Sequence, residues 1–302
     1  MRTAGLAALT KRNVKLYFKD KGMFFSSLIT PLILLVLYTT FLKNVFEDSF
    51  RGTLDAAGAA VSDSIIGGCV GGQLVSSLLA VSCVTVAFCS NLLMVQDKIS
   101  GARRDLTVTP VHSGTLALSY YASSLLSTLI ISFAASAVCF AYLAAEGWYL
   151  STADVAAVIG DVILLCLFGT ALSSCVNFPL TTQGQASAVG TIVSAGYGFI
   201  CGAYMPISQF SDGLQKVLSF LPGTYGTSML RNHALHGVFE EMSDHGFPDQ
   251  VIESIRDSVD CNIYFYGDKV SIGNMYIILP ASIAILVALY VLMNVIKAKR
   301  EK

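Results

Sequence analysis

Long apolar runs between short polar connectors are the feature that most limits what this chain can fold into. Six of these runs are rich in Leu, Val, Ile, Ala, Phe and Tyr, and each reaches the roughly 20 residues that one membrane crossing needs. The 302 residues are 54% hydrophobic and only 13% charged, whereas soluble domains are about 25% charged. A soluble core could not bury so much apolar surface. The sequence therefore predicts an all-α, polytopic membrane protein with a single transmembrane domain over residues 1–302.

The apolar runs predict six transmembrane helices. Their expected bounds are 22–42, 65–95, 115–145, 155–178, 186–205 and 273–296. The second and third runs are too long for one perpendicular crossing, so these helices should tilt or project beyond the bilayer. The first run is longer than the core of a cleavable signal, and no small-x-small cleavage site follows it, which favours a retained span.

Lysine and arginine predict the orientation of the spans. Thirteen of the 19 lie before the first span, between the second and third spans, or after the sixth. Because cytoplasmic segments are enriched in these residues, both termini should be cytoplasmic, in a chain that crosses the cell (plasma) membrane. Residues 1–21 would then form a basic interfacial helix on the inner leaflet, although a solvated basic tail would also set the orientation.

Two acidic segments are expected on the outer side. Residues 43–64 should form a short loop, and residues 206–272 a longer external region. The first part of the longer region has apolar residues at helical spacing, which predicts a short amphipathic or re-entrant helix at the outer surface. These apolar residues are Ile207, Phe210, Leu214, Leu218 and Leu221.

The connector between the second and third spans, "QDKISGARRDLTVTPVHS", gathers five charges between two nearly uncharged runs. Burying them at mid-bilayer would cost roughly 3 kcal/mol each, so they must lie in water or against a polar partner. "DKISGARRDL" could form a short helix, which ends before Pro110 because a proline disfavours a helical conformation at the residue that precedes it. A solvated inner loop and a docking element for a cytoplasmic partner both fit this pattern.

Catalytic groups are not apparent in the sequence. It contains no G-x-x-x-x-G-K-S/T motif, so it cannot bind nucleotide phosphates by that route. Asp161 is the one clear acid within a span, which makes an ion-coupled secondary transporter or channel the alternative function. Asp161 has no intramembrane Lys, Arg or His partner in the predicted spans, and this argues against proton coupling. His233 and His236 could hold a metal with nearby carboxylates, but their loose spacing favours an ordinary polar loop.

Small residues recur every four positions in the second and fifth spans, a pattern that lets helix backbones approach closely in lipid. Such stripes could pack within one subunit or form a dimer interface beside a transport path. The glycines in these stripes are Gly68, Gly72, Gly190, Gly198 and Gly202. Polar side chains of the same spans that would line a cavity are Gln73, Ser77, Thr85, Thr191, Ser194 and Tyr197.

Seven of the eight cysteines lie inside apolar runs, where a thiol behaves as a small hydrophobic group. Cys261 lies in a polar segment instead. Whether Cys261 pairs with a second copy of the chain is left open by the sequence.

The chain resembles the type-2 ATP-binding-cassette exporter permeases over essentially its whole length. "RNVKLYFKDKGMFFSSLITPLILLVLY" is similar to the entry helix and first span of that family. The connector resembles the family element that follows the second span, with a charged start, a glycine and "TP". "GAYMPISQFSDGLQKVLSFLPGTYGTSMLR" is similar to the stretch that follows the fifth span. The departures are residues 231–272, which are longer than in many members, and the pair Arg103–Arg104.

The resemblance implies the permease subunit of an ATP-driven exporter of lipophilic drug-like, peptide or lipid-linked molecules. It implies a homodimer or heterodimer in the lipid bilayer, with each permease docked on a separate ABC ATPase that binds ATP and Mg. This chain would then be no enzyme, carry no cofactor and bind no nucleic acid. The resemblance also implies that the connector 96–114 is a coupling helix and that the helix after Pro206 is an outer lid. The expected coupling residues are Asp97, Lys98, Gly101, Arg103, Arg104, Asp105, Thr109 and Pro110.

Overall fold

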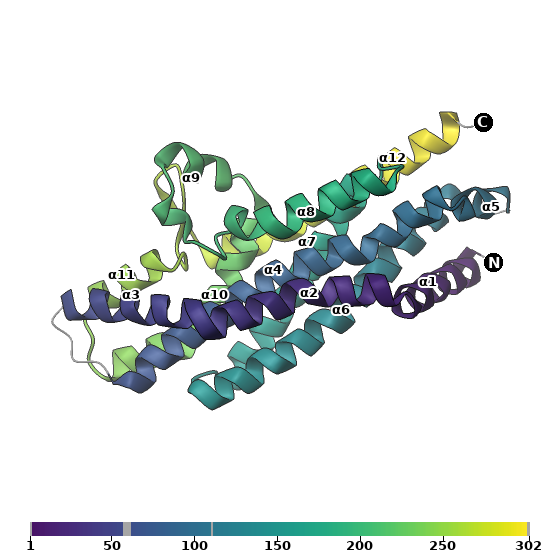
Figure 1. Cartoon of the computed structure of the whole chain (residues 1–302). Coiled ribbons are helices and arrows are strands. Elements are labelled where there is room, and N and C mark those ends of the chain that lie inside the picture. The colour runs from purple at the N-terminus through teal and green to yellow at the C-terminus, as the bar shows by residue number, and fades with distance from the viewer. Residues whose placement is uncertain (1, 57–61, 110, 301–302) are drawn as a thin grey trace.

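The computed structural model of this chain describes residues 2–56, 62–109 and 111–300. In these residues the chain forms a bundle of long helices that run roughly side by side (Figure 1). The expected helical membrane fold is thus confirmed, with one addition. A small antiparallel hairpin, β1 (Ile263–Phe265) and β2 (Asp268–Val270), turns at Tyr266 and Gly267, both of which have positive φ.

Five helical segments of the described residues are long and apolar enough to cross a membrane. They are Lys21–Gly52, Asp63–Ile99 (α4), Ser113–Glu146 (α6), Thr152–Asn177 (α7) and Ile272–Lys297, the last within α12 (Ile272–Arg300). The sixth expected span, 186–205, corresponds to α8 (Gln183–Ile200), which is not among the five. Its glycine, serine, threonine and glutamine residues make it less apolar, and 18 residues extend about 27 Å. The count of six spans is therefore not confirmed.

The first span continues beyond its predicted end. A helix α2 (Lys21–Leu37) passes through a π-helical turn (Tyr38–Leu42) into α3 (Lys43–Ala56). The sequence predicted a loop at 43–64, and this prediction was wrong for 43–56, which form a helix. Charged side chains of this helix are paired with other side chains. Lys43 forms an ion pair with Glu146 at 2.6 Å, and Arg51 lies 2.8 Å from both Glu47 and Asp63. Residues 57–61 lie outside the described residues.

α4 is the central helix of the bundle. It packs against α2, α6, α7, α8 and α10, and nearly all of its residues are buried. The helix expected in residues 1–21 is present as α1 (Arg2–Lys19), which packs mainly on α6. Figure 1 shows α1, the end of α12 and the connector between α4 and α6 at the same end of the bundle.

The expected external region 206–272 contains a helix that sequence reasoning missed. α10 (Pro222–Asp244) packs inside the bundle against α4, α7 and α12, so the prediction of a wholly external region was wrong. The predicted amphipathic helix is divided into a 3-10 turn (Ile207–Gln209) and α9 (Asp212–Leu218). α11 (Asp249–Ser258) and the hairpin complete the region.

Candidate coupling site and buried polar clusters

The connector is built around a break at Gly101. α4 runs on to Ile99, Gly101 adopts a left-handed conformation with φ +84°, and α5 (Ala102–Val108) follows. A side chain at this φ would be strained, so glycine suits the break. The helix predicted for "DKISGARRDL" is thus two helices, whose junction lies at Gly101. Pro110 lies outside the described residues.

Asp97 faces the interior of the bundle and is almost fully buried. Its carboxylate accepts a hydrogen bond of 2.7 Å from the Arg12 guanidinium of α1 and another of 2.7 Å from the Tyr120 hydroxyl of α6. Charge-assisted hydrogen bonds of this kind are the strong ones. Asp97 therefore joins α1 and α6 to the last turn of α4.

Lys98 and Arg103 also turn inward. The Lys98 ammonium donates hydrogen bonds to the carbonyls of Asn177, Phe178 and Leu180, where α7 ends. A cation is favourable there because the carboxyl end of a helix carries partial negative charge. Arg103 donates to the side-chain oxygen of Asn294 in α12 at 3.2 Å. These two charges fasten the connector to the ends of α7 and α12.

The remaining connector residues form an exposed tip. Arg104, Asp105 and Thr109 are exposed, and the apolar side chain of Val108 is 83% exposed. Arg104 and Val108 are four residues apart on one side of α5, a spacing that places side chains together on a helix surface. We call Arg104, Asp105, Val108 and Thr109 the α5 tip. Arg104, Asp105 and Thr109 of the tip are expected coupling residues, whereas Val108 was not. A second protein could contact the tip without displacing contacts between the connector and other helices.

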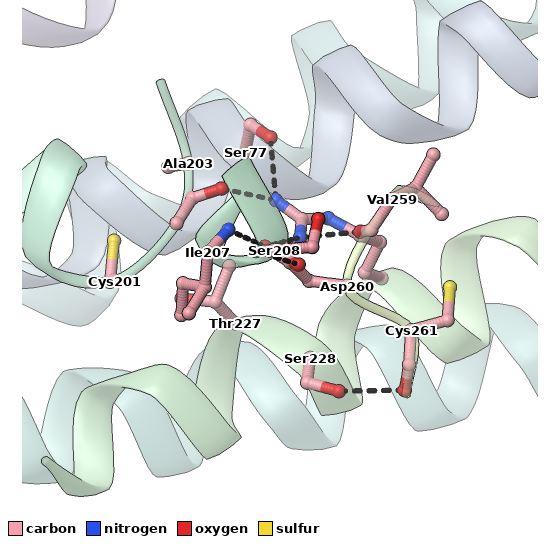
Figure 2. Close-up of polar contacts among 12 residues, drawn as sticks. Ser77, Cys201, Ala203, Ile207, Ser208, Thr227, Ser228, Val259, Asp260 and Cys261 are labelled. Atoms are coloured by element: carbon pink, nitrogen blue, oxygen red, sulfur yellow. Dashed lines mark hydrogen bonds and ion pairs between the residues drawn. The ribbon is translucent and has the colours of Figure 1, made fainter. Parts of the chain in front are cut away.

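A fully buried arginine, Arg231, joins several segments of the bundle. Figure 2 shows residues of these segments, among them Ser77, Val259 and Asp260, lying close together. Arg231 of α10 lies 3.5 Å from Asp260 and donates to the carbonyls of Val259 at 2.6 Å and Gly202 at 2.8 Å. It also donates to Ser77 of α4 at 3.2 Å. We call Arg231 and Asp260 with these partners the Arg231 cluster.

Asp260 completes the Arg231 cluster from the opposite side. Its carboxylate accepts hydrogen bonds from the backbone amides of Ile207 at 2.6 Å and Ser208 at 3.3 Å. The cluster thus ties α10 to α4, to the segment after α8 and to the end of α11. Sequence reasoning had placed Arg231 in the external region, because the position of α10 was not evident.

Asp161 has partners that the sequence did not reveal. It is 1% exposed, lies 2.6 Å from Nδ1 of His233 on α10, and accepts a hydrogen bond of 3.0 Å from the Tyr276 hydroxyl of α12. The expectation of a solitary intramembrane acid was therefore wrong. One turn further along α10, His236 lies 3.0 Å from Asp154.

The two histidines lie on a packed helix and not in a polar loop. Each contacts a different aspartate, and the described residues contain no group of three or more metal-ligating side chains. Cys261 is buried, and burial raises the pKa of its thiol to about 12. A thiol in this state is a poor candidate for pairing with a second copy.

The six expected cavity residues differ in their surroundings. Gln73 is fully buried, and its amide has no hydrogen-bond partner among the described residues. Ser77 belongs to the Arg231 cluster, and Thr85 donates to the carbonyl of Val81 in its own helix. On α8, Thr191 is exposed, Ser194 is half-buried and Tyr197 is buried beside a cavity. The last three therefore differ in their environment although they share one helix.

The glycine stripe of α4 packs within the chain. A Cβ atom on Gly68 would lie 2.7 Å from the Tyr149 ring, and one on Gly72 would lie 2.9 Å from the backbone carbonyl of Ala234 in α10. In α8, Gly198 packs against Tyr204, whereas Gly190 has open space where a Cβ would lie. Gly202 has φ +74° and contacts Ile207 and Asp260.

The fold and its anchored connector define a polytopic membrane protein built around one buried central helix. The chain belongs to the ABC-2 type transporter family, since the model of that family matches residues 5–234. The match runs from α1 to the middle of α10 and includes the connector. The protein is thus an ABC transporter permease, and the resemblance seen in the sequence is confirmed. A comparison with curated proteins gave no match.

Proposed function

We propose that this chain is the membrane subunit of an ATP-driven exporter that acts as a dimer with a separate ABC ATPase. Its substrate would be a lipophilic drug-like, peptide or lipid-linked molecule, moved out of the cytoplasm. α8 would form the sixth span, and both termini would be cytoplasmic in the plasma membrane. ATP and Mg would be bound by the ATPase.

The arrangement of the connector carries this proposal. Asp97, Lys98 and Arg103 anchor its base to α1, α6, α7 and α12, while the α5 tip is exposed. A rigid base with an exposed charged and apolar tip suits an element that transmits movement from a second protein. The tip would enter a groove of the ATPase, and closure of the ATPases would displace the base and the helices fastened to it.

The exposed face of α8 supports the dimer. Thr191 is exposed, and Gly190 has open space around its Cβ position. Small residues with an unoccupied face allow a second helix to approach closely in lipid. We propose that the stripe containing Gly190 contacts the second permease, whereas Gly68 and Gly72 serve packing within one subunit.

Charge reversal at the α5 tip tests the coupling role. Arg104→Glu combined with Val108→Asp should lower recovery of the ATPase with the tagged permease about tenfold or more, because like charges across an interface cost several kcal/mol. The measurement is quantitative mass spectrometry of the purified complex, with the ATPase identified by its nucleotide-binding motif.

The matched control is Lys19→Glu, an exposed charge reversal at the carboxyl end of α1. It should leave recovery unchanged. Full recovery of the ATPase in the Arg104→Glu/Val108→Asp variant would contradict the assignment of α5 as the coupling helix.

One observation favours a second candidate function, an ion-coupled transporter or channel. Asp161 is buried and hydrogen-bonded to His233 and Tyr276, and intramembrane acids often bind protons or ions. Under the proposed function, vesicles that hold only this chain should dissipate an imposed pH gradient no faster than empty vesicles, as followed by an enclosed pH-sensitive dye. Faster dissipation that is lost in Asp161→Asn would favour the alternative.

A further inference from the structure

A cavity of ≈ 490 Å³ lies between α7, α8, α12 and the amino end of α10. Ligand pockets commonly have volumes of about 300–1,000 Å³. Most of the side chains that line it are apolar and come from three helices, α7, α8 and α12. Representative residues are Phe168 and Leu172 of α7, Ile192 and Val193 of α8, and Ile285 and Leu286 of α12.

The cavity is bordered by exposed apolar side chains. Ile192 and Ile285 line it and are 70% and 68% exposed. Phe168 lies about 24 Å from the first residue of α7, given a rise of about 1.5 Å per residue, and so lies well inside that span. A molecule dissolved in lipid could therefore enter between α8 and α12 without crossing water.

One polar group of the cavity lacks a partner. Tyr197 is 7% exposed, and its hydroxyl has no hydrogen-bond partner among the described residues. The hydroxyl oxygen lies against the first turn of α10, since a Cβ atom on Gly223 would be 2.5 Å from it. Leaving such a buried group unsatisfied is unfavourable.

The amino end of α10 adds a second donor region at the same point. The helix begins at Pro222, and no side chain caps it. Pro222 has no amide hydrogen and the Thr224 amide donates to the carbonyl of Leu221, so Gly223 is the first-turn residue whose amide can serve as a donor at this end, which carries partial positive charge. In many transporters, the amino ends of helices that stop inside the membrane face electron-rich groups of the substrate.

We infer that this cavity binds a long-chain amphiphile from the bilayer that carries a carbonyl or carboxylate group. Its hydrocarbon chain would pack between α7, α8 and α12. The acceptor group would take a hydrogen bond from Tyr197 and lie at the amino end of α10. Whether this ligand is cargo or a retained lipid rests on the proposed function; the binding itself does not.

The test is photo-crosslinking of the purified chain in dodecyl maltoside, a detergent without a carbonyl group. The probe is a palmitate analogue that carries a diazirine in its chain, and the labelled peptides are mapped by mass spectrometry. We expect labels on α7, α8 and α12. Unlabelled oleate should compete with the probe and lower labelling if the site binds a carboxylate. Methyl oleate should also lower labelling if a carbonyl group is sufficient for binding. Octadecane, which has neither group, should lower labelling only weakly.

Variants separate the hydroxyl from the cavity itself. Tyr197→Phe removes only the hydroxyl and should lower labelling about tenfold, since a hydrogen bond to a charged acceptor contributes at least that much. Ile192→Trp should fill the entrance and abolish labelling. The matched control is Tyr204→Phe, because the Tyr204 hydroxyl already donates to the carbonyl of Ser194.

Three results would overturn the inference. They are labels outside these helices, wild-type labelling of Tyr197→Phe, and competition by octadecane as strong as that by oleate. No ATPase is present in this experiment, so a failure here would leave the coupling proposal standing. Conversely, a failure of the α5 tip variants to lower ATPase recovery would leave the ligand site standing.

Discussion

Arg231→Met should destabilise the protein by about 3–5 kcal/mol, the usual cost of removing one partner from a buried ion pair. Arg231 has no exposed surface, and Asp260 would remain buried without its cation. The amides of Ile207 and Ser208 would still donate to Asp260, but they do not neutralise its charge. The measurement is equilibrium unfolding of the purified protein in detergent.

Two further variants make this result specific. Asp260→Asn added to Arg231→Met should recover much of the lost stability, because the uncompensated charge is then gone. Lys269→Met removes an ion pair with Glu253 in which both side chains are about half exposed, so it should cost about 1 kcal/mol or less. Equal stability of Arg231→Met and Lys269→Met would contradict the role of the Arg231 cluster.

Gly237→Ala, in α10, should be more damaging than a methyl addition at any of the glycines named above. A Cβ at this position of α10 would collide with the backbone carbonyl of Tyr149, which cannot rotate away as a side chain can. Overpacking typically costs about 1–3 kcal/mol and occasionally more. The variant should therefore lower the unfolding midpoint by several degrees, as measured by thermal unfolding followed by circular dichroism.

Gly160→Ala in α7 is the matched control, because nothing lies within 4 Å of its Cβ position. It should be neutral or slightly stabilising, since alanine has the higher helix propensity. If Gly237→Ala were as stable as Gly160→Ala, the close packing of α10 against the segment before α7 would be refuted.

The apolar runs were sufficient to predict most of the membrane helices. The third run was expected at 115–145 and forms α6 (Ser113–Glu146), and the fourth was expected at 155–178 and forms α7 (Thr152–Asn177). Such runs can be recognised in a sequence because every position of a membrane span tends to be apolar, whatever its neighbours are. The sequence also predicted that the charges of the connector lie in water or against a polar partner, because charges cannot remain in the hydrocarbon region without partners.

The same charge argument could not tell which connector residues face a partner. Asp97 and Lys98 are satisfied by Arg12 and by the carbonyls at the end of α7, which are distant in sequence. Arg104 and Asp105 have the same chemistry but remain exposed. Composition established that the charges needed partners, and only the packing of α1, α6 and α7 around the base determined which charges found them within the chain.

The position of α10 could not be predicted from the sequence, because it too depends on partners that are distant along the chain. Its polar residues suggest an external segment, but buried polar groups are tolerated when partners satisfy them. For Arg231 the partners are Asp260 and backbone carbonyls, and for His233 the partner is Asp161, 72 residues away. Apolar length alone established a multi-pass helical membrane protein. The packing of α10 inside the bundle, its buried charges and the cavity at its amino end arise from contacts between distant segments, which no local pattern records.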